Sequence, residues 1–584
     1  MDEIVGKAGF FHRLRYLVLP YFRSEEKWTA YGFSALNMLL TLLVVGANYA
    51  IVVWNGTFYN AMQAYDVKRI WFLCFLFFVI VAFIVLINTA QQYCIQVMQI
   101  RWRHWMTRKL VGAWTHGQTH YRMQLSGKAI DNPDQRISDD VDFFSGQTVN
   151  LPISVLQSAV TIISFGVMLW RLSAPLRLFG LYIPGLLLWF NLFYAVGGTA
   201  VLILIGKPLF FLNNLQQKVM GDFRFELIRV RDNSETIATA RADDVERDRL
   251  EREFAPVVEV FFKRIYRTVF VNLFSFAYTG ASGVLPFLLV LPSYLAKRIM
   301  IGTVSQTFGA FNQTQTAFAF IINNFSSIGQ GYLSITQWRA VIDRLYTLEV
   351  NLRHYNNESA SPDIVYQQNP TPALDIDHLS LALPGGRILL RDLSVHVAPG
   401  ERLLISGTTG AGKSTLIRAI AGIWPFGEGE VRMPGGQVLF IPQRPYLPNA
   451  PLIESLSFPY GRTFDVVDVR AVLGHFGLDR LADRLDDVET WDRELSLGEQ
   501  QRIAFARAVL LKPDVIILDE ATSSLDEQYE ALAYRALIQA TSSKATIISV
   551  GHRSTIARFH RRRLHLAGDG TWRDEPIEAL TAAD

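Results

Sequence analysis

Long apolar stretches without charge dominate the first 340 residues of the 584-residue chain. Six of them contain no Asp, Glu, Lys or Arg: Trp28–Tyr65, Ile70–Ile100, Val149–Trp170, Leu178–Gly206, Thr268–Ala296 and Ile299–Trp338. Each is longer than the roughly 20 residues that an α-helix needs to cross a bilayer. Because they are continuously apolar rather than alternating, helices are favoured over the strands of a β-barrel. The pattern predicts six transmembrane helices.

The connections between these stretches alternate in length and charge. The first, third and fifth connections are short and carry two basic residues each, whereas the segments near 101–146 and 207–267 are long, polar and rich in Arg. The positive-inside bias places both termini and the two long connections in the cytoplasm. Since few Gly or Pro interrupt the long connections, we expect the spans to continue out of the membrane as charged helices.

The pattern changes after residue 350. The segment Asn357–Pro372 is polar and contains prolines, which predicts a linker. The run ERLLISGTTGAGKSTLIRAIAGI then reads as a strand, a Gly-rich loop and a helix, with the spacing of a P-loop. In such a loop, backbone N–H groups surround phosphate at a helix N-terminus. Lys413 would reach the β- and γ-phosphates of ATP, and Ser414 would hold Mg²⁺. The expected nucleotide-binding residues here are Gly407, Thr408, Thr409, Gly410, Ala411, Gly412, Lys413, Ser414 and Thr415.

A second apolar strand, Asp514–Glu520, ends in two carboxylates about a hundred residues after the P-loop. We expect Asp519 to support the metal, and Glu520 to position and polarise the attacking water. Gln443, between the two motifs, suits a loop that contacts the metal or the water, and His552 suits a γ-phosphate contact at the end of another strand. A lone Gln or His is more often structural, but the order and spacing here favour catalytic roles for Gln443, Glu520 and His552.

Composition narrows the partners. Half of the residues are hydrophobic and only 19% are charged, and the net charge of +3 is too small to indicate a nucleic-acid partner. Cys74 and Cys94 lie in one apolar run, roughly 30 Å apart if that run is helical, so we expect no disulfide and no Cys-based metal site. The N-terminus lacks a short apolar core with a small-residue cleavage site, so we expect no cleaved signal peptide.

The order P-loop, Gln443, LSLGEQQR, LDE, SSLD and His552 resembles the nucleotide-binding domains of ABC transporters. Segments such as FYNAMQAYD, DNPDQRISDD and QWRAVIDRL resemble the SbmA/BacA-like peptide transporters, and more distantly the peroxisomal subfamily D half-transporters for fatty acyl chains. The resemblance implies an exporter-type membrane α-helical bundle joined to an α/β P-loop NTPase domain. We expect a transmembrane domain over residues 1–350, with an N-terminal elbow helix, six spans and cytoplasmic coupling helices, then a linker over 351–372 and a nucleotide-binding domain over 373–584.

The resemblance also implies roles for the remaining motifs. Ser496 and Gly498 of LSLGEQQR would contact a γ-phosphate, and Asp526 of SSLD would belong to the nucleotide site. The chain carries one P-loop and one such serine, which in ABC motors face each other across a dimer, so a homodimer with two composite sites is implied. The segments Asn132–Arg136 and Asp222–Glu235 would carry movement to the spans, although DNPDQR could instead be a capped turn.

One departure from the ABC pattern concerns adenine. Where many ABC domains place an aromatic ring before the P-loop, this chain has Leu383 and Pro384. Adenine stacking is therefore weaker or supplied elsewhere, which leaves the preference for ATP over GTP open.

The residues leave the substrate open as well. Asn, Gln, Ser and Thr are frequent in the spans, where they pack helices or line a cavity. A large polar cavity suits peptides or other bulky hydrophilic solutes, and the resemblance implies uptake of peptides, including antimicrobial peptides, across a bacterial inner membrane. The alternatives are a transporter of fatty acyl-CoA, another lipid or a cobalamin-type cofactor, or an ATP-gated membrane regulator that moves no solute. The direction of transport does not follow from the pattern.

Overall fold

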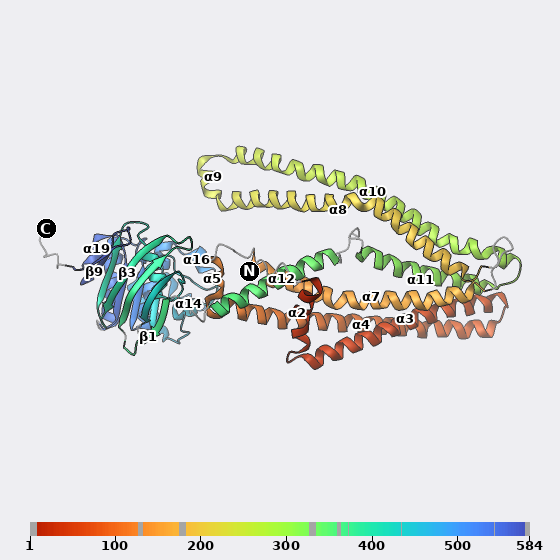
Figure 1. The fold of residues 1–584 in the computed structure, drawn as a ribbon, viewed down its shortest axis with the longest axis horizontal. Coiled ribbons are helices and arrows are strands. Elements are labelled where there is room, and N and C mark those ends of the chain that lie inside the picture. The colour runs from red at the N-terminus through yellow and green to blue at the C-terminus, as the bar shows by residue number, and fades with distance from the viewer. Residues whose placement is uncertain are drawn as a thin grey trace. The chain divides into compact units, whose positions relative to one another are not determined.

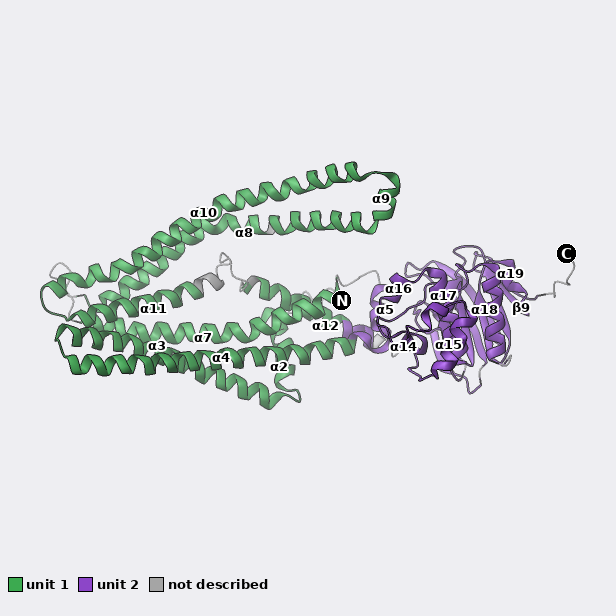
Figure 2. Cartoon of the chain, turned by 180° about the vertical axis from the view of Figure 1, so that it is seen from behind, with its two compact units in different colours: residues 1–113, 130–351 green, residues 114–129, 352–584 purple. Residues whose placement is uncertain are grey.

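The computed structural model describes residues 9–125, 132–174, 183–325, 335–358, 364–371, 373–433, 435–541 and 544–577. The chain divides into two compact units, which Figure 2 distinguishes by colour. The first unit comprises residues 1–113 and 130–351, and the second comprises residues 114–129 and 352–584. The second unit therefore includes a short segment from the N-terminal half of the sequence.

The first unit is entirely helical within the residues described. Its helices are α2 (Phe10–Phe22), α3 (Lys27–Gln63), α4 (Val67–Thr115, whose last residues belong to the second unit), α6 (Pro133–Gln135), α7 (Val141–Leu172), α8 (Leu186–Asp232), α9 (Ser234–Ala240), α10 (Asp243–Leu295), α11 (Ile301–Phe325) and α12 (Ile335–Glu358, whose last turns belong to the second unit). A π-helical turn, Arg136–Asp140, joins α6 to α7.

Five of the described helices are long and apolar enough to cross a membrane, namely α3, α4, α7, α8 and α10. They carry the first five predicted spans, although residues 178–182 of the fourth lie outside the described residues. The sixth predicted span, Ile299–Trp338, corresponds to α11 and the first residues of α12, and residues 326–334 between them lie outside the described residues. The predicted fold class, a helical membrane domain with an α/β nucleotide-binding domain, is confirmed.

The long charged connections are helical, as expected. The helix α4 continues beyond its apolar part to Thr115, and α8 and α10 continue for many residues beyond theirs, joined by α9. Figure 1 shows the outer halves of α8 and α10 standing clear of α3, α4 and α7. At the other end of the first unit, the five helices α3, α7, α8, α10 and α11 share a core that includes Val52, Phe165, Leu169, Leu187, Val290 and Ala310.

The second unit contains two sheets within its described residues. One has the strand order β1-β5-β2-β3, built from β1 (Ile364–Gln368), β2 (Leu374–Ala382), β3 (Ile388–Val397) and β5 (Gly427–Met433). The other has the order β10-β9-β4-β8-β7-β6, built from β4 (Arg402–Gly407), β6 (Val438–Ile441), β7 (Val515–Asp519), β8 (Thr546–Val550), β9 (Arg562–Leu566) and β10 (Trp572–Pro576). Its strands pair in parallel except for β9 with β10.

Helices of the second unit pack on these sheets. They are α5 (Thr119–Leu125), α13 (Lys413–Ile420), α14 (Leu452–Ser457), α15 (Val466–His475), α16 (Trp491–Glu494), α17 (Leu497–Leu511), α18 (Glu527–Ala540) and α19 (Ser554–Ala557). Parallel strands β6, β7, β8 and β4 bring their carboxyl ends to one edge, where ligands bind in open α/β sheets. This edge is therefore where a ligand site is expected.

Much of the region expected to be a linker is regular structure. Residues 351–358 continue α12, and residues 364–368 form β1, which pairs in parallel with β5. Residues 359–363 and 372 lie outside the described residues. Residues 114–125 of the N-terminal half also contact this unit: Leu125 packs on the buried core that includes Leu416 and Ile548, and Thr119 Oγ1 donates a hydrogen bond to Asn356.

Candidate functional site

The P-loop connects β4 to α13, which confirms the predicted strand, loop and helix. Gly407, Gly410 and Gly412 have positive φ values of 146°, 83° and 95°. At Gly407 a side chain has no room as well, since a Cβ there would lie 2.3 Å from the carbonyl oxygen of Leu566. Residues with positive φ that alternate with residues of negative φ turn successive backbone N–H groups toward one point. The result is an anion-binding concavity. The loop is thus shaped for phosphate.

Lys413, the first residue of α13, extends back over the P-loop. Its ammonium group donates hydrogen bonds of 3.0 Å to the carbonyl oxygens of both Gly407 and Thr408, and the residue is only 6% exposed. Burial lowers the pKa of Lys413, and the nearby carboxylates Glu520 and Asp519 oppose that shift. A buried cation at the floor of an anion-binding loop suits the β- and γ-phosphates of a nucleotide.

Asp519 ends β7 beside the start of α13, and its Oδ1 accepts a hydrogen bond of 3.3 Å from Ser414 Oγ. Burial raises the pKa of Asp519, and the Ser414 hydrogen bond counteracts part of this shift. A half-buried hydroxyl and carboxylate side by side are the oxygen ligands that Mg²⁺ takes together with phosphate and water. The described residues contain no group of three or more His, Cys, Asp or Glu side chains placed to hold a metal ion. The two oxygen ligands of Ser414 and Asp519 fit a Mg²⁺ bound together with nucleotide phosphate.

Glu520 contacts two further residues that the sequence predicts for the site, Gln443 and His552. Its Oε2 accepts from Gln443 Nε2 at 3.4 Å, and its Oε1 lies 3.4 Å from His552 Nε2. These three side chains follow the carboxyl ends of β6, β7 and β8, so the parallel sheet brings them together. Glu520 adopts a φ of +50°, which costs a non-glycine residue about 1–3 kcal/mol. Such strain is retained where the position of the side chain matters.

The LSLGEQQR motif begins α17. Ser496 is the N-cap: its Oγ accepts from the backbone N–H of Glu499 at 3.3 Å, and Glu499 Oε2 accepts from the backbone N–H of Ser496 at 3.0 Å. Gly498 lies against the chain at Ser524, where an added Cβ would be 3.2 Å from the carbonyl oxygen. Ser496 and Gly498 therefore lie at the N-terminus of α17. Asp526 likewise caps α18, accepting from the backbone N–H of Tyr529 at 2.7 Å.

Gln501 is a site residue that the sequence reasoning missed. Its amide nitrogen donates to the carbonyl oxygen of Gln443 at 2.9 Å and to Ser523 Oγ at 3.1 Å, and its amide oxygen accepts from the backbone N–H of Ser524 at 3.0 Å. It is fully buried. Gln501 thereby ties α17 to the loop that carries Gln443. The sequence offered one signal for this role, a glutamine within the LSLGEQQR motif, and the motif alone does not show that its side chain is buried.

The structure thus brings together Lys413, Ser414, Gln443, Asp519, Glu520 and His552 at one sheet edge. It does not join Ser496 to them, since no hydrogen bond or ion pair recorded between the described residues connects Ser496 or Gly498 to the P-loop of the same chain. Of the two residues at the expected adenine position, Leu383 packs against the buried core of the second unit. It offers no flat ring for stacking.

Comparisons with known proteins agree with this geometry. Residues 14–295 match the family model described as ABC transporter transmembrane region 2, and residues 390–523 match the family model described as ABC transporter. The chain is 34% identical to an uncharacterized ABC transporter ATP-binding protein of Synechocystis, over 95% of this chain and 83% of the relative. It is 31% identical to the chloroplastic ABC transporter D family member 2 of Arabidopsis thaliana, over 96% and 87%. It is 27% identical to the human lysosomal cobalamin transporter ABCD4, over 96% of each.

The chain belongs to the ABC transporter family, in which ATP hydrolysis is coupled to transport. Within it, the chain is a half-transporter similar to the D family, with one membrane region fused to one ATPase. It is an integral membrane protein whose build implies dimerisation.

Proposed function

We propose that the chain works as a homodimer with two equivalent ATP sites. Lys413 and Glu520 of one copy would hold and hydrolyse an ATP whose γ-phosphate is contacted by Ser496 and Gly498 of the partner subunit. The separation of Ser496 from its own P-loop supports this assignment. The N-terminus of α17 suits the γ-phosphate of a partner's ATP, because helix N-termini favour negative charge.

The outer halves of α8 and α10 give a second argument for a partner copy. Phe225, Phe262 and Tyr266 on these halves are each 65% exposed, although they lie on helix extensions rich in charge. Large apolar side chains in such a position indicate a covered surface in the assembly. We assign this surface to the second copy.

Within each site we assign roles by the contacts described above. Backbone N–H groups of Gly407–Thr415 and the Lys413 ammonium would bind the phosphates. Ser414, Gln443 and Asp519 would hold Mg²⁺, which supplies charge stabilisation on the phosphate oxygens. Glu520 would orient and polarise the attacking water, and His552 would contact the γ-phosphate. Asp526 would keep α18 in place beside the site.

Movement would reach the spans through the first long connection. The segment 114–129 belongs to the compact unit that contains the ATP site, and Leu125 packs on its core. We propose that this segment, the neighbouring turn Asn132–Arg136 and the hairpin segment Asp222–Glu235 couple the ATP cycle to alternating access.

For the substrate we propose a bulky hydrophilic solute, with peptides as the first candidate. The single observation that carries this proposal is the presence of polar, uncharged side chains that stay exposed within the charge-free stretches, as at Gln92 and Thr316. Other polar residues there pack helices instead: Gln315 Nε2 donates to Asn191 Oδ1, and Tyr278 donates to Gln315 Oε1. A cobalamin-type cofactor is the second candidate, since one relative is named a cobalamin transporter and cobalamin is also large and polar.

We further propose uptake across a bacterial inner membrane, with both termini and the ATPase unit in the cytoplasm. The Arg-rich long connections support this orientation through the positive-inside bias.

Reconstituted vesicles test these proposals. We expect ATP to drive accumulation of a labelled peptide by the wild-type protein and not by Glu520→Gln, which keeps the fold and the nucleotide site but loses the carboxylate. Equal accumulation by both proteins would exclude ATP-driven transport. Comparing a peptide, cobalamin and a fatty acyl-CoA as stimulators of ATPase activity in the same vesicles separates the substrate classes, and stimulation by acyl-CoA alone would overturn the hydrophilic assignment.

A further inference from the structure

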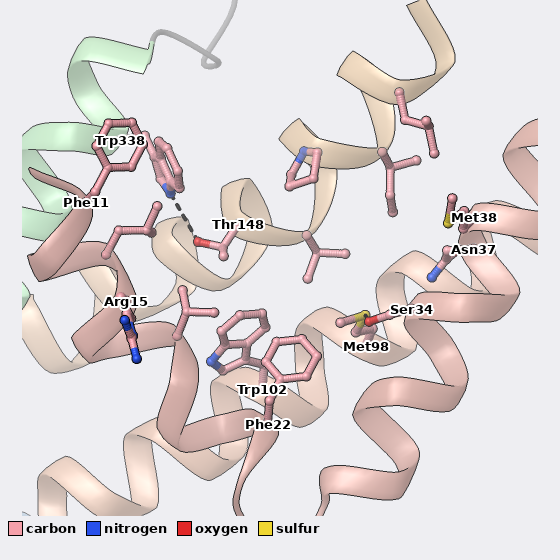
Figure 3. Close-up of a pocket in the computed structure, with 16 residues that line it drawn as sticks. Phe11, Arg15, Phe22, Ser34, Asn37, Met38, Met98, Trp102, Thr148 and Trp338 are labelled. Carbon is pink, nitrogen blue, oxygen red and sulfur yellow. Dashed lines mark hydrogen bonds between the residues drawn. The ribbon is translucent and has the colours of Figure 1, made fainter. Parts of the chain in front are cut away.

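The first unit contains a cavity that none of the residues assigned to the ATP site line. It has a volume of about 590 Å³ and is lined by residues of α2, α3, α4, α7 and α12 (Figure 3). This volume falls within the range of roughly 300–1,000 Å³ of small-molecule sites. Its walls are mostly apolar side chains, and two of them, Phe11 and Met38, are 80% and 53% exposed. An edge of the cavity therefore lies at the surface of the helical unit.

Two polar groups in the wall are buried and have no partner among the described residues. Asn37 is 1% exposed, and neither its amide oxygen nor its amide nitrogen makes a hydrogen bond. The indole N–H of Trp102, also 1% exposed, is likewise without an acceptor. Figure 3 shows both side chains on the wall of the same cavity. Leaving such groups unpaired is costly, so their persistence indicates a ligand that carries hydrogen-bonding atoms into an apolar space.

A positive charge completes the site. Arg15 is the single charged side chain among the described residues of the lining; it is exposed, and no ion pair is recorded for it in the described structure. The lining residues Ser34 and Met98 lie near the ends of the first and second apolar stretches, and Val149 begins the third. The cavity thus sits at the boundary between the apolar spans and their charged extensions, which is the depth of lipid headgroups.

We propose that this cavity binds an anionic phospholipid from the leaflet that faces the charged helix extensions. An acyl chain would fill the apolar space, the phosphate would pair with Arg15, and the ester oxygens would accept from the Trp102 indole and the Asn37 amide. The charge and the two buried polar groups favour a phospholipid over a purely apolar occupant. Basic pockets between membrane helices on the cytoplasmic side commonly recognise such headgroups.

Native mass spectrometry of the full-length protein in detergent tests the proposal with phosphatidylglycerol and phosphatidylcholine of identical acyl chains. We expect one phosphatidylglycerol per chain, held about tenfold more tightly than phosphatidylcholine because the zwitterionic headgroup satisfies Arg15 less well. Arg15→Gln should remove this preference, and inorganic phosphate should not compete. Phe78→Leu, at a 71% exposed position of α4 outside the cavity, is the control and should retain phosphatidylglycerol like the wild type.

Asn37→Leu distinguishes a role of Asn37 in lipid binding from a role in the stability of the fold. Because the amide is unpaired when the cavity holds no lipid, the substitution should raise the thermal unfolding midpoint of the delipidated protein while weakening phosphatidylglycerol retention severalfold. A structural role would move both readouts in the same direction. Equal binding of the two lipids, or equal losses in Arg15→Gln and Phe78→Leu, would show nonspecific surface lipid and overturn the proposal.

Discussion

Arg480 and Glu499 form an ion pair beside the helix N-terminus that begins the LSLGEQQR motif, with Arg480 Nη2 2.7 Å from Glu499 Oε1. The other carboxylate oxygen of Glu499 accepts from both the backbone N–H and the hydroxyl of Ser496. Burial raises the pKa of Glu499, but the hydrogen bonds from Arg480 and Ser496 outweigh it and hold the pKa below its ordinary value. A charged carboxylate thus sits next to a serine assigned to γ-phosphate, and Arg480 neutralises it.

Loss of Arg480 should weaken the ATP-bound dimer. In Arg480→Ala the uncompensated Glu499 would repel the γ-phosphate, and we expect the KM for ATP to rise about tenfold, equivalent to ~1.4 kcal/mol. The second substitution in Arg480→Ala/Glu499→Gln should restore most of the affinity by removing the repelling charge. Arg470→Ala, which breaks an exposed ion pair with Asp483, is the control. A double variant as impaired as Arg480→Ala would contradict charge compensation.

If each ATP site is built from two chains, two dimers that carry the same substitutions distributed differently between their chains should differ in ATPase rate. A dimer of one Lys413→Ala copy and one Ser496→Arg copy keeps one intact site, so about half of the wild-type ATPase rate is expected. A dimer of one wild-type copy and one copy carrying both substitutions has two damaged sites and should be inactive. Differently tagged copies allow both dimers to be purified and assayed. The reverse result, activity only in the second arrangement, would show that each site lies within one chain.

The pair of Arg344 and Asp140 should be important for stability. Arg344 on α12 holds Asp140 at the end of the π-helical turn with two hydrogen bonds, of 2.7 Å and 2.5 Å, and the Asp140 side chain is 11% exposed. Arg344→Ala leaves this carboxylate unpaired and should cost about 2 kcal/mol. The neighbouring ion pair of Arg103 and Asp142 serves as the control because it joins the same residue types but is more exposed, at 39% and 46%. Arg103→Ala should therefore lower the free energy of unfolding by only about 0–1 kcal/mol. Thermal unfolding in detergent compares the two, and equal costs would refute the distinction.

His560 should make the second unit sensitive to mild acid. Its ring is 5% exposed and bonded to Ile556 O and Ser549 Oγ, and burial lowers its pKa to about 4. Between that value and the ordinary 6.5 the unfolded chain takes up a proton that the folded chain excludes, so stability falls as pH decreases through this window. The loss should approach about 3 kcal/mol by pH 4.

The measurement for His560 compares the wild type with His560→Gln, whose side chain does not titrate. We expect thermal loss of nucleotide binding by the full-length protein to shift less with pH in the variant. Carboxylates that titrate in the same window affect both proteins alike, so the difference isolates the imidazole. Parallel pH profiles would show that His560 does not exclude the proton.

The sequence by itself determined the elements and most of the ATP site. Charge-free stretches longer than a bilayer is thick predict spans, and motif residues at the ends of parallel strands must meet at one edge. Lys413, Asp519 and Glu520 could therefore be assigned from the motifs alone. The spans depend on the local periodicity of apolar residues, and the meeting of the motifs depends on the fixed geometry of a parallel sheet. Both can be recognised from the order of residues along the chain.

Only the tertiary structure decided which distant side chains meet. Gln501 bonding Gln443, Arg344 holding Asp140 and Leu125 packing on the core of the ATPase unit are contacts across 58, 204 and hundreds of positions. It also decided that Asn191 and Gln315 pack helices, while Asn37 is left unpaired in a cavity. Such outcomes depend on how helices pack in three dimensions, because an amide in a span has the same sequence signature whether it faces a partner or an empty space.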